Sequence, residues 1–273
     1  MAMEYYQIPP ERLGEGARLP IVKCESSEAA FQALAEEMCA VIRANNAAGR
    51  RTVLICPVGP VGQYPYFVRQ VIEEHLSLRD CWIINMDEYL TDDGAYIDME
   101  SPLSFRGYMA REVYGKIDPA LLMPPEQRIF PDPSDPGQVT RLIEKLGGVD
   151  ACFGGIGITG HLAFNEPQPA LSPEQFSQLT TRVLDIAPET RATNCSADLG
   201  GALEALPRKC ITVGMKEILS AKKLRLAVFR DWHRAVCRRA AYGEVTSAFP
   251  VTLAQEHPDA VLYVNHIAAG QPF

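Results

Sequence analysis

The chain has 273 residues, of which 47% are apolar and 22% charged, and this is the composition of an ordinary globular protein. Its net charge of −8 at pH 7 argues against broad nucleic-acid binding, which needs a basic face, but leaves room for a small anion held by local arginines. No apolar run approaches membrane-spanning length, no signal peptide is recognisable, and the 8 cysteines include no Cys-x-x-Cys pair, so we expect reduced thiols, no metal site and a cytoplasmic location.

Predicted helices and strands alternate along the chain. Ser26 or Ser27 can cap a helix whose apolar side chains, from Phe31 to Ile42, recur at helical spacing. In chain order, we then expect a strand at 52–56, a proline- and glycine-rich loop at 57–65, a helix to about residue 76, a strand at 81–85, a helix at 104–114, a proline-rich surface connection at 124–136, a helix at 139–146 and strands at 149–153, 210–213, 224–229 and 260–264. This alternation predicts one α/β domain with a mainly parallel sheet and helices on both faces.

Residues 154–167 are the most informative stretch. The apolar run at 149–153 predicts a buried strand, and four glycines then let the backbone turn sharply and approach a ligand. His161 and Glu166 follow, and a carboxylate beside an imidazole fixes its tautomer and raises its proton affinity. A strand end that opens into such a turn is where α/β proteins place active sites.

The same glycines match the dinucleotide-binding pattern Gly155-x-Gly157-x-x-Gly160. That pattern requires a full helix next, with its N-terminus facing the pyrophosphate, but Pro167 interrupts within two turns. No acidic residue ends a second strand about 20 residues further on, where a ribose partner is expected. We therefore favour a catalytic turn, and the alternative for His161 is an ordinary structural histidine.

A second acid–base candidate is Asp87, which follows the apolar run 82–86 and is predicted at the end of a strand. Because the carboxyl ends of parallel strands share one edge of a sheet, we expect Asp87 and His161 on that edge. A partly desolvated carboxylate there can remove a proton α to a carbonyl. The alternative is an aspartate that only caps a turn.

These residues resemble the glucosamine-6-phosphate deaminase/isomerase family. The matching pieces are residues 85–89, 154–157, 160–167, 190–194, 212–214, 250–253 and 257–258, in the family's order and spread over a core of about residues 25–265. The Gly-His-x-Ala-Phe-Asn-Glu-Pro piece is the most specific, since the sister 6-phosphogluconolactonases lack its Phe-Asn-Glu-Pro ending. The resemblance implies a single Rossmann-like domain over residues 1–273, and an aldose–ketose isomerisation coupled to loss of ammonia, with no metal or organic cofactor.

The resemblance implies Asp87, His161 and Glu166 as the catalytic residues. His161 would open the sugar ring by moving a proton between the ring oxygen and the anomeric hydroxyl, and Glu166 would hold its imidazole. Asp87 would carry a proton from C2 to C1 through an enolamine. The predicted substrate-binding residues are Gly59, Gly62, Glu88, Thr159, Gly160, Arg191 and Arg234, with Arg191 on the phosphate.

Three departures from the family pattern bear on the substrate. Thr159 stands where the family has an aspartate, and because threonine carries no charge we expect His161 to be less basic than its family counterpart. The loop 57–62 has valines in place of hydroxyl residues, and Pro60 lacks a backbone donor, so a phosphate loses hydrogen bonds typically worth about 1.5–3 kcal/mol each. The family's phosphate lysine falls within 230–235, where Arg234 is the nearest substitute and Arg230 and His233 are alternatives.

Three functions stay open at this point. The first is conversion of an amino-sugar 6-phosphate to a ketose 6-phosphate and ammonia, the second is a related isomerase with a changed sugar substrate, and the third is a non-catalytic sugar-phosphate-binding protein. In each case the expected partner is a small-molecule sugar phosphate, and neither nucleic acid nor membrane is expected. The assembly is left open, from monomer to homo-oligomer.

Overall fold

Two sheets organise the computed structural model, which describes residues 4–273. Within that range, the larger sheet is 7-stranded and parallel, in the order β1-β10-β9-β6-β2-β3-β5. Its strands are β1 (Ile21–Cys24), β2 (Thr52–Cys56), β3 (Cys81–Asn85), β5 (Arg128–Ile129), β6 (Ala151–Gly155), β9 (Lys223–Val228) and β10 (Ala260–Asn265). A 3-stranded antiparallel sheet contains β4 (Asp87–Leu90), β8 (Lys209–Thr212) and β7 (Arg182–Asp185). The predicted α/β class with a mainly parallel sheet is confirmed.

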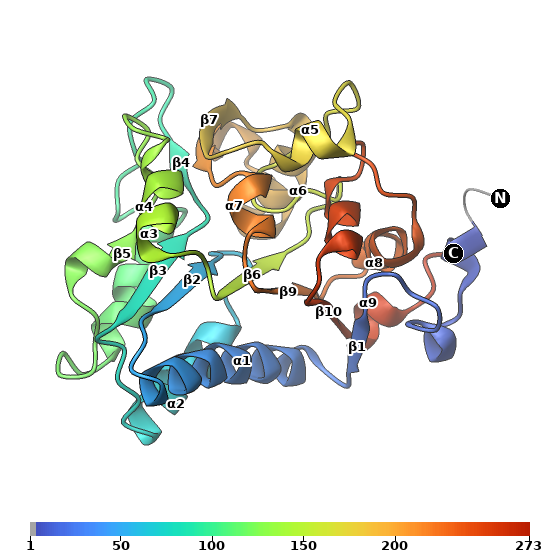
Figure 1. Ribbon diagram of the computed structural model, residues 1–273. Helices are drawn as coiled ribbons and strands as arrows, with labels where there is room; N and C mark the ends of the chain where they lie inside the picture. The colour runs from blue at the N-terminus through green and yellow to red at the C-terminus, as the bar shows by residue number, and fades with distance from the viewer. Residues whose placement is uncertain (1–3) are drawn as a thin grey trace.

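Helices cover both faces of the larger sheet (Figure 1). The longer ones are α1 (Ser27–Ala47), α2 (Gln63–Glu73), α4 (Gln138–Leu146), α6 (Pro188–Asp198) and α8 (His233–Tyr242), and the shorter ones are α3 (Phe105–Tyr108), α5 (Pro173–Ser177), α7 (Met215–Leu219) and α9 (His266–Ala269). α1 and α2 lie below the sheet in Figure 1, and α7 and α8 lie above it. Among the described residues, no helix is long and apolar enough to cross a membrane.

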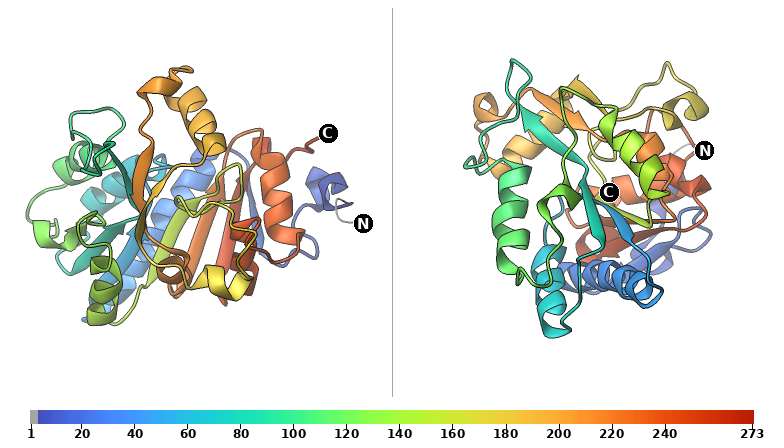
Figure 2. Two further views of the ribbon diagram at one scale, coloured as in Figure 1. Left: turned by 90° about the horizontal axis from the view of Figure 1, so that it is seen from above. Right: turned by 60° about the vertical axis from the view of Figure 1, so that its left-hand side comes forward.

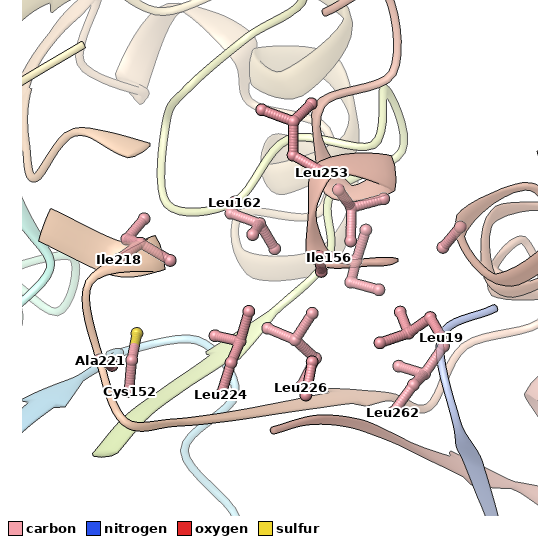
Figure 3. Close-up of a cluster of buried hydrophobic side chains, with 14 of the residues drawn as sticks. Leu19, Cys152, Ile156, Leu162, Ile218, Ala221, Leu224, Leu226, Leu253 and Leu262 are labelled. Carbon is pink, nitrogen blue, oxygen red and sulfur yellow. The ribbon is translucent and has the colours of Figure 1, made fainter. Parts of the chain in front are cut away.

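The alternating helices and strands bury two apolar layers, one on each face of the larger sheet. Leu34 and Phe67, from α1 and α2, pack against one face, and Ile218 of α7 and Val236 of α8 pack against the other. The second layer also receives Ile156 and Leu162, which flank the glycine turn and face the strand residues beneath them (Figure 3). The apolar ends of this turn are therefore anchored in the core, while the residues between them reach its rim.

The structure contains an antiparallel sheet in addition to the parallel sheet that the sequence predicted. The right-hand view of Figure 2 shows β3 running on toward β4, as the chain passes out of the larger sheet. The backbone joins the two sheets at this point, since Met86 donates to Cys56 and accepts from Val213. Asp87, predicted at the end of a strand, therefore follows the end of β3 and is itself the first residue of β4.

Three element predictions need correction. The strand expected at 210–213 exists as β8, but it pairs antiparallel with β4 and β7 instead of joining the parallel sheet. The helix expected at 104–114 is α3 followed by a π-helical turn at Met109–Val113 and a 3₁₀ turn at Tyr114–Lys116, in a segment interrupted by poor helix formers such as Gly107. The connection expected at 124–136 contains β5, whose two residues are too few to show a strand period.

A buried arginine ties the two ends of the described chain to α8. The Arg238 side chain is 0% exposed, and its nitrogens donate to the carbonyl oxygens of Ile8, Arg234, Ala269 and Gly270 at distances of 2.8–3.0 Å. A guanidinium is suited to this position because its fork supplies five donors and no acceptor. The N-terminal segment and the end of α9 thereby share one polar anchor.

Replacing Arg238 by methionine removes the hydrogen bonds that the guanidinium donates to these carbonyl oxygens. We expect Arg238→Met to lower the free energy of unfolding by about 2–4 kcal/mol, since each lost bond to a charged donor is worth about 1.5–3 kcal/mol and such losses are not additive. Chemical denaturation at constant pH measures this change. Arg79→Met, at an exposed arginine, is the matched control, and equal stability of the two variants would contradict the anchoring role.

Candidate active site

The strand order of the larger sheet reverses between β2 and β6, which are neighbours. From β2 the chain moves outward through β3 to β5, whereas β6, β9 and β10 occupy the other side. Loops that leave the carboxyl ends of strands on either side of such a reversal enclose a binding crevice. Here the loops touch, because a Cβ on Gly155 would lie 2.9 Å from Cδ of Pro60 and 3.2 Å from the carbonyl oxygen of Gly59.

The turn that carries His161 depends on two glycines. The amide of Gly157 donates to the carbonyl of His161, and the amide of Gly160 donates to that of Gly157, both at 2.9 Å. The imidazole lies directly on Gly157, where a Cβ would be 1.9 Å from the ring. Gly160 has φ +80°, in the left-handed region that favours glycine, and a Cβ there would be 2.6 Å from the ring of Phe249. The turn therefore fits only glycine at both positions.

Three side chains, those of Thr159, Glu166 and Thr190, surround Nδ1 of His161. Oε1 of Glu166 lies 3.2 Å from this nitrogen. The hydroxyl of Thr159 donates to Oε2 of Glu166 at 2.7 Å, and that of Thr190 donates to Oε1. Burial raises the pKa of Glu166, but the imidazole and the two hydroxyl groups outweigh burial, and the net pKa lies below its ordinary value. Glu166 is therefore an anion at neutral pH.

Thr190 is the member of this cluster that the sequence analysis did not single out. It lies in the first turn of α6 and is 1% exposed. Thr190 does lie within the matching piece 190–194, but the sequence analysis selected Arg191 from that piece. Nothing local connects Thr190 with residues 159–166, since the contact exists only because α6 packs beside the turn.

Asp87 reaches the same edge from β3. It pairs in β4 with Thr212, whose hydroxyl accepts the amide of Phe164 at 3.0 Å. The ring of Phe164 is stacked on that of His161, with 6.3 Å between centroids and 17° between planes. Only β2 separates β3 from β6, so the two strand ends are about 10 Å apart by normal strand spacing. The structure therefore places Asp87 and the turn that carries His161 at the carboxyl ends of β3 and β6, on the same side of the sheet.

The pKa of the Asp87 carboxyl lies far above that of an ordinary aspartate. It is 7% exposed, and burial, with a smaller contribution from the charge of Glu88, raises its pKa to about 8. A carboxyl in this state is mostly neutral at pH 7 and becomes a strong base once it ionises. Such a group is suited to accept and return a proton near neutral pH.

Glu88 occupies a structural position. Its side chain is fully buried, and its carboxylate accepts from the hydroxyl of Ser104 and from the amides of Phe105 and Arg106, at the start of α3. It thus holds the N-terminus of α3, where an anion is favoured. Predicted as a substrate-binding residue, Glu88 has no exposed atom with which to contact a substrate.

The remaining predicted substrate-binding residues differ in what they can offer. Gly59 has φ +149° in the loop after β2, and Gly62 directly precedes α2, where a Cβ would be 2.3 Å from the ring of Phe31. One terminal nitrogen of Arg191 donates to the carbonyls of Leu203 and Leu206, each at 3.1 Å. Its guanidinium is thus held on the segment that follows α6.

The sequence analysis proposed that a cation in the segment 230–235 holds the phosphate. In the structure, the two arginines of this segment can do so and the histidine cannot. Nε of Arg234 donates to the carbonyl of Ile267 at 3.1 Å, and Arg230 is exposed. His233 is buried, both of its nitrogens are hydrogen-bonded to backbone, and burial lowers its pKa to about 4. A neutral imidazole with both nitrogens occupied cannot hold a phosphate, so Arg230 and Arg234 are the candidates that remain.

Among residues 4–273, no cluster of His, Cys, Asp or Glu is arranged to hold a metal ion.

The chain is similar in sequence to several deaminases. It is 30% identical over 217 residues to a glucosamine-6-phosphate deaminase of Bacillus velezensis, an alignment that covers 77% of this chain and 83% of the other. It is 30% identical over 216 residues to the protein of that name in Rhodopirellula baltica, covering 77% and 79% of the two chains. With the one from Porphyromonas gingivalis strain W83, the identity is 29% over 223 residues and covers 79% of each chain. No family model matches the chain.

Solved structures share the fold. A monomeric glucosamine-6-phosphate deaminase superposes with a TM-score of 0.78 at 24% identity, covering 91% of this chain and 98% of the other. A 6-phosphogluconolactonase from Trypanosoma cruzi superposes with a TM-score of 0.65 at 15% identity, covering 91% and 95%. At these identities the structural likeness concerns the fold alone.

The raised pKa of Asp87 predicts how stability depends on pH. An unfolded aspartate has a pKa of about 3.9, so between pH 4 and about 8 the folded state binds more protons than the unfolded state. This residue therefore makes the protein less stable as pH rises through that window, by up to about 1.4 kcal/mol per pH unit. We expect Asp87→Asn to flatten the slope and to be more stable than the wild type at pH 8. Denaturant unfolding at pH 5, 6, 7 and 8 measures both slopes, and parallel slopes would contradict the assignment.

Proposed function

This chain belongs to the glucosamine-6-phosphate deaminase family, and on that premise we propose that it converts an amino-sugar 6-phosphate and water to a ketose 6-phosphate and ammonia. The observation that carries the proposal is the pair of proton-transfer groups at one strand reversal. A buried carboxyl whose pKa is about 8, Asp87, lies across β2 from an imidazole held by an ionised carboxylate.

The first step is opening of the sugar ring, and His161 carries it. Its imidazole takes the proton of the anomeric hydroxyl and returns a proton to the ring oxygen, which breaks the bond between C1 and that oxygen. Glu166 stabilises the imidazolium formed on the way, since an anion 3.2 Å from Nδ1 favours the charged ring. The product of this step is an open-chain 2-amino aldehyde.

The second step is proton transfer at C2, and Asp87 carries it. The aldehyde acidifies the proton on C2, and the ionised carboxylate removes it while the aldehyde oxygen takes up a proton from solvent, which gives an enolamine. The same carboxyl then delivers a proton to C1. Because the group is buried and its pKa is raised to about 8, its carboxylate is a stronger base than an exposed aspartate. Water then adds to C2 of the resulting imine, ammonia leaves, and a ketose 6-phosphate remains, so that atoms balance without a redox partner.

The loop between β2 and α2 supports a second candidate, a related isomerase with a changed sugar substrate. Val58 and Val61 pack against the core on the side of α1 and α2, and a valine side chain has no hydrogen-bond donor. The anionic end of the substrate then relies on the arginines. An arginine fork binds phosphate or carboxylate bidentately, so this arrangement is compatible with more than one kind of sugar acid.

The proposal includes a location in the cytoplasm. All 8 cysteines are free thiols in the structure, and 7 of them are buried. Free buried thiols are typical of proteins kept in a reducing compartment. A homo-oligomer stays a prediction, as does the absence of nucleic-acid and membrane partners.

Removal of the proposed base tests the reaction. We expect the purified protein to release ammonia from glucosamine 6-phosphate, and Asp87→Asn to lower kcat by about 10²–10⁴-fold, since this is the usual contribution of general acid–base catalysis. For the wild type, kcat/KM should rise with pH up to about 8, where Asp87 ionises. A coupled ammonia assay measures both. Turnover that survives in Asp87→Asn would remove this residue from the mechanism, and binding without turnover would favour the non-catalytic alternative.

Substitution of the candidate cations tests the anion grip. We expect Arg234→Gln and Arg230→Gln to raise KM for a sugar 6-phosphate at least about tenfold if the arginine contacts the phosphate, while kcat changes less, because uniform binding is lost. Arg239→Gln, on α8 with its guanidinium 4.2 Å from the ring of Phe249, is the control. An unchanged KM in both test variants would direct attention back to Arg191.

A further inference from the structure

We propose that Thr159 and Thr190 are positioning residues that hold His161 in the tautomer with its proton on Nδ1, and thereby leave Nε2 as the atom that exchanges protons with the substrate. The assignment of the tautomer stands on hydrogen-bond geometry. The role of Nε2 toward a sugar rests on the proposed function.

The hydroxyl hydrogens of the two threonines are both used by one carboxylate. Thr159 donates to Oε2 of Glu166, and Thr190 donates to Oε1. A hydroxyl has a single hydrogen, so neither threonine has another to donate. Toward any further neighbour, both hydroxyl oxygens can only accept.

The neighbours of Nδ1 of His161 are then all acceptors. Oγ1 of Thr159 lies 2.9 Å from Nδ1, Oγ1 of Thr190 lies 3.3 Å away, and Oε1 of Glu166 lies 3.2 Å away. A lone pair on Nδ1 would face three other sets of lone pairs, one of them on an anion. A hydrogen on Nδ1 instead has only acceptors as neighbours, and this arrangement places the neutral ring's lone pair on Nε2.

Nε2 is correspondingly available. Among the described residues it has no hydrogen-bond partner, and 11% of the His161 side chain remains exposed. The ring is held between Gly157 and Phe164, so the free nitrogen keeps one orientation. An imidazole base must present an unoccupied nitrogen to its substrate, and this geometry leaves only one.

A second histidine in the same fold shows the opposite tautomer and serves as an internal reference. Nδ1 of His233 accepts the amides of Phe229 and Arg230, at 3.2 and 2.9 Å, so this nitrogen carries no proton. Its Nε2 lies 2.9 Å from the carbonyl oxygen of Ile156, which can only accept. His233 is therefore protonated on Nε2.

The two threonines also come from separate parts of the chain. Thr159 belongs to the glycine turn, whereas Thr190 belongs to α6, so both segments must be in place before Nδ1 is enclosed. A single aspartate beside the histidine would add a second negative charge to the cluster. The two threonines also place acceptors beside Nδ1, but they leave Glu166 as the one anion of this cluster. Compared with an aspartate, they therefore lower the negative charge beside the ring and still hold the same nitrogen.

Nitrogen-15 NMR of histidine-labelled protein tests the tautomer directly. At pH 8, we expect long-range proton–nitrogen spectra to show the Nδ1–H pattern for His161 and the Nε2–H pattern for His233, with His161→Gln and His233→Gln to assign the signals. In Thr159→Val/Thr190→Val, two of the three acceptors beside Nδ1 are lost and Oε1 of Glu166 remains, so the His161 pattern should shift part of the way toward Nε2–H while that of His233 stays unchanged. An Nε2–H pattern for wild-type His161, or an unchanged pattern in the double variant, overturns the proposal. The wild-type spectrum decides even if the double variant does not fold.

Kinetics separate a positioning role from substrate binding. We expect Thr159→Val to lower kcat at least about tenfold with KM within a factor of about three, and Thr159→Ser to restore kcat, because serine keeps the hydroxyl. A rise in KM with kcat preserved would make Thr159 a substrate contact, as the sequence analysis expected, and would overturn its positioning role. If the wild type turns over no amino-sugar phosphate, the proposed function fails, while the NMR result still decides the tautomer.

Discussion

One ionised carboxylate organises the candidate site. Glu166 faces Nδ1 of His161 and accepts both threonine hydroxyls, so a single side chain connects the glycine turn, the segment that follows it and the start of α6. Burial of this carboxylate is tolerable only because its oxygens are paired, since an unpaired buried charge is strongly disfavoured. The same bonds that keep Glu166 ionised therefore link α6 to the glycine turn and hold acceptors beside the imidazole.

The site combines this hydrogen-bonded anion with a buried acid whose pKa is raised. Burial, with a smaller contribution from the charge of Glu88, raises the pKa of Asp87 to about 8, whereas the pKa of Glu166 is lowered. The surroundings of these two carboxyl groups thus shift their pKa values in opposite directions, and this separation is what an acid–base mechanism requires. The antiparallel sheet creates the difference, because pairing of β4 with β8 takes Asp87 out of solvent.

The departures from the family pattern acquire a physical interpretation in three dimensions. Thr159, which removes a charge from the cluster, joins Thr190 in a hydrogen-bonded arrangement that leaves one anion beside the imidazole. His233 in the segment 230–235 connects the end of β9 to the end of β6 through backbone contacts. The change in the loop 57–62 is not compensated in this way, because the valines there pack against the core. The residues proposed for proton transfer thus match the family pattern, and the residues proposed to hold the substrate's anionic end are where this chain departs from it.

Local patterns in the sequence determined the α/β class, the strands that surround the strand reversal and the residues His161, Glu166 and Asp87, because buried strands, sharp glycine turns and titratable side chains each leave a signal within a few residues. The tertiary structure alone decided the antiparallel sheet, the burial of Asp87 and Glu88, and the participation of Thr190. These depend on contacts between segments far apart in the chain, such as Asp87 with Thr212 and Thr190 with Glu166. Hydrogen bonds of this kind exist only after packing has brought their partners together, so no spacing along the chain records them.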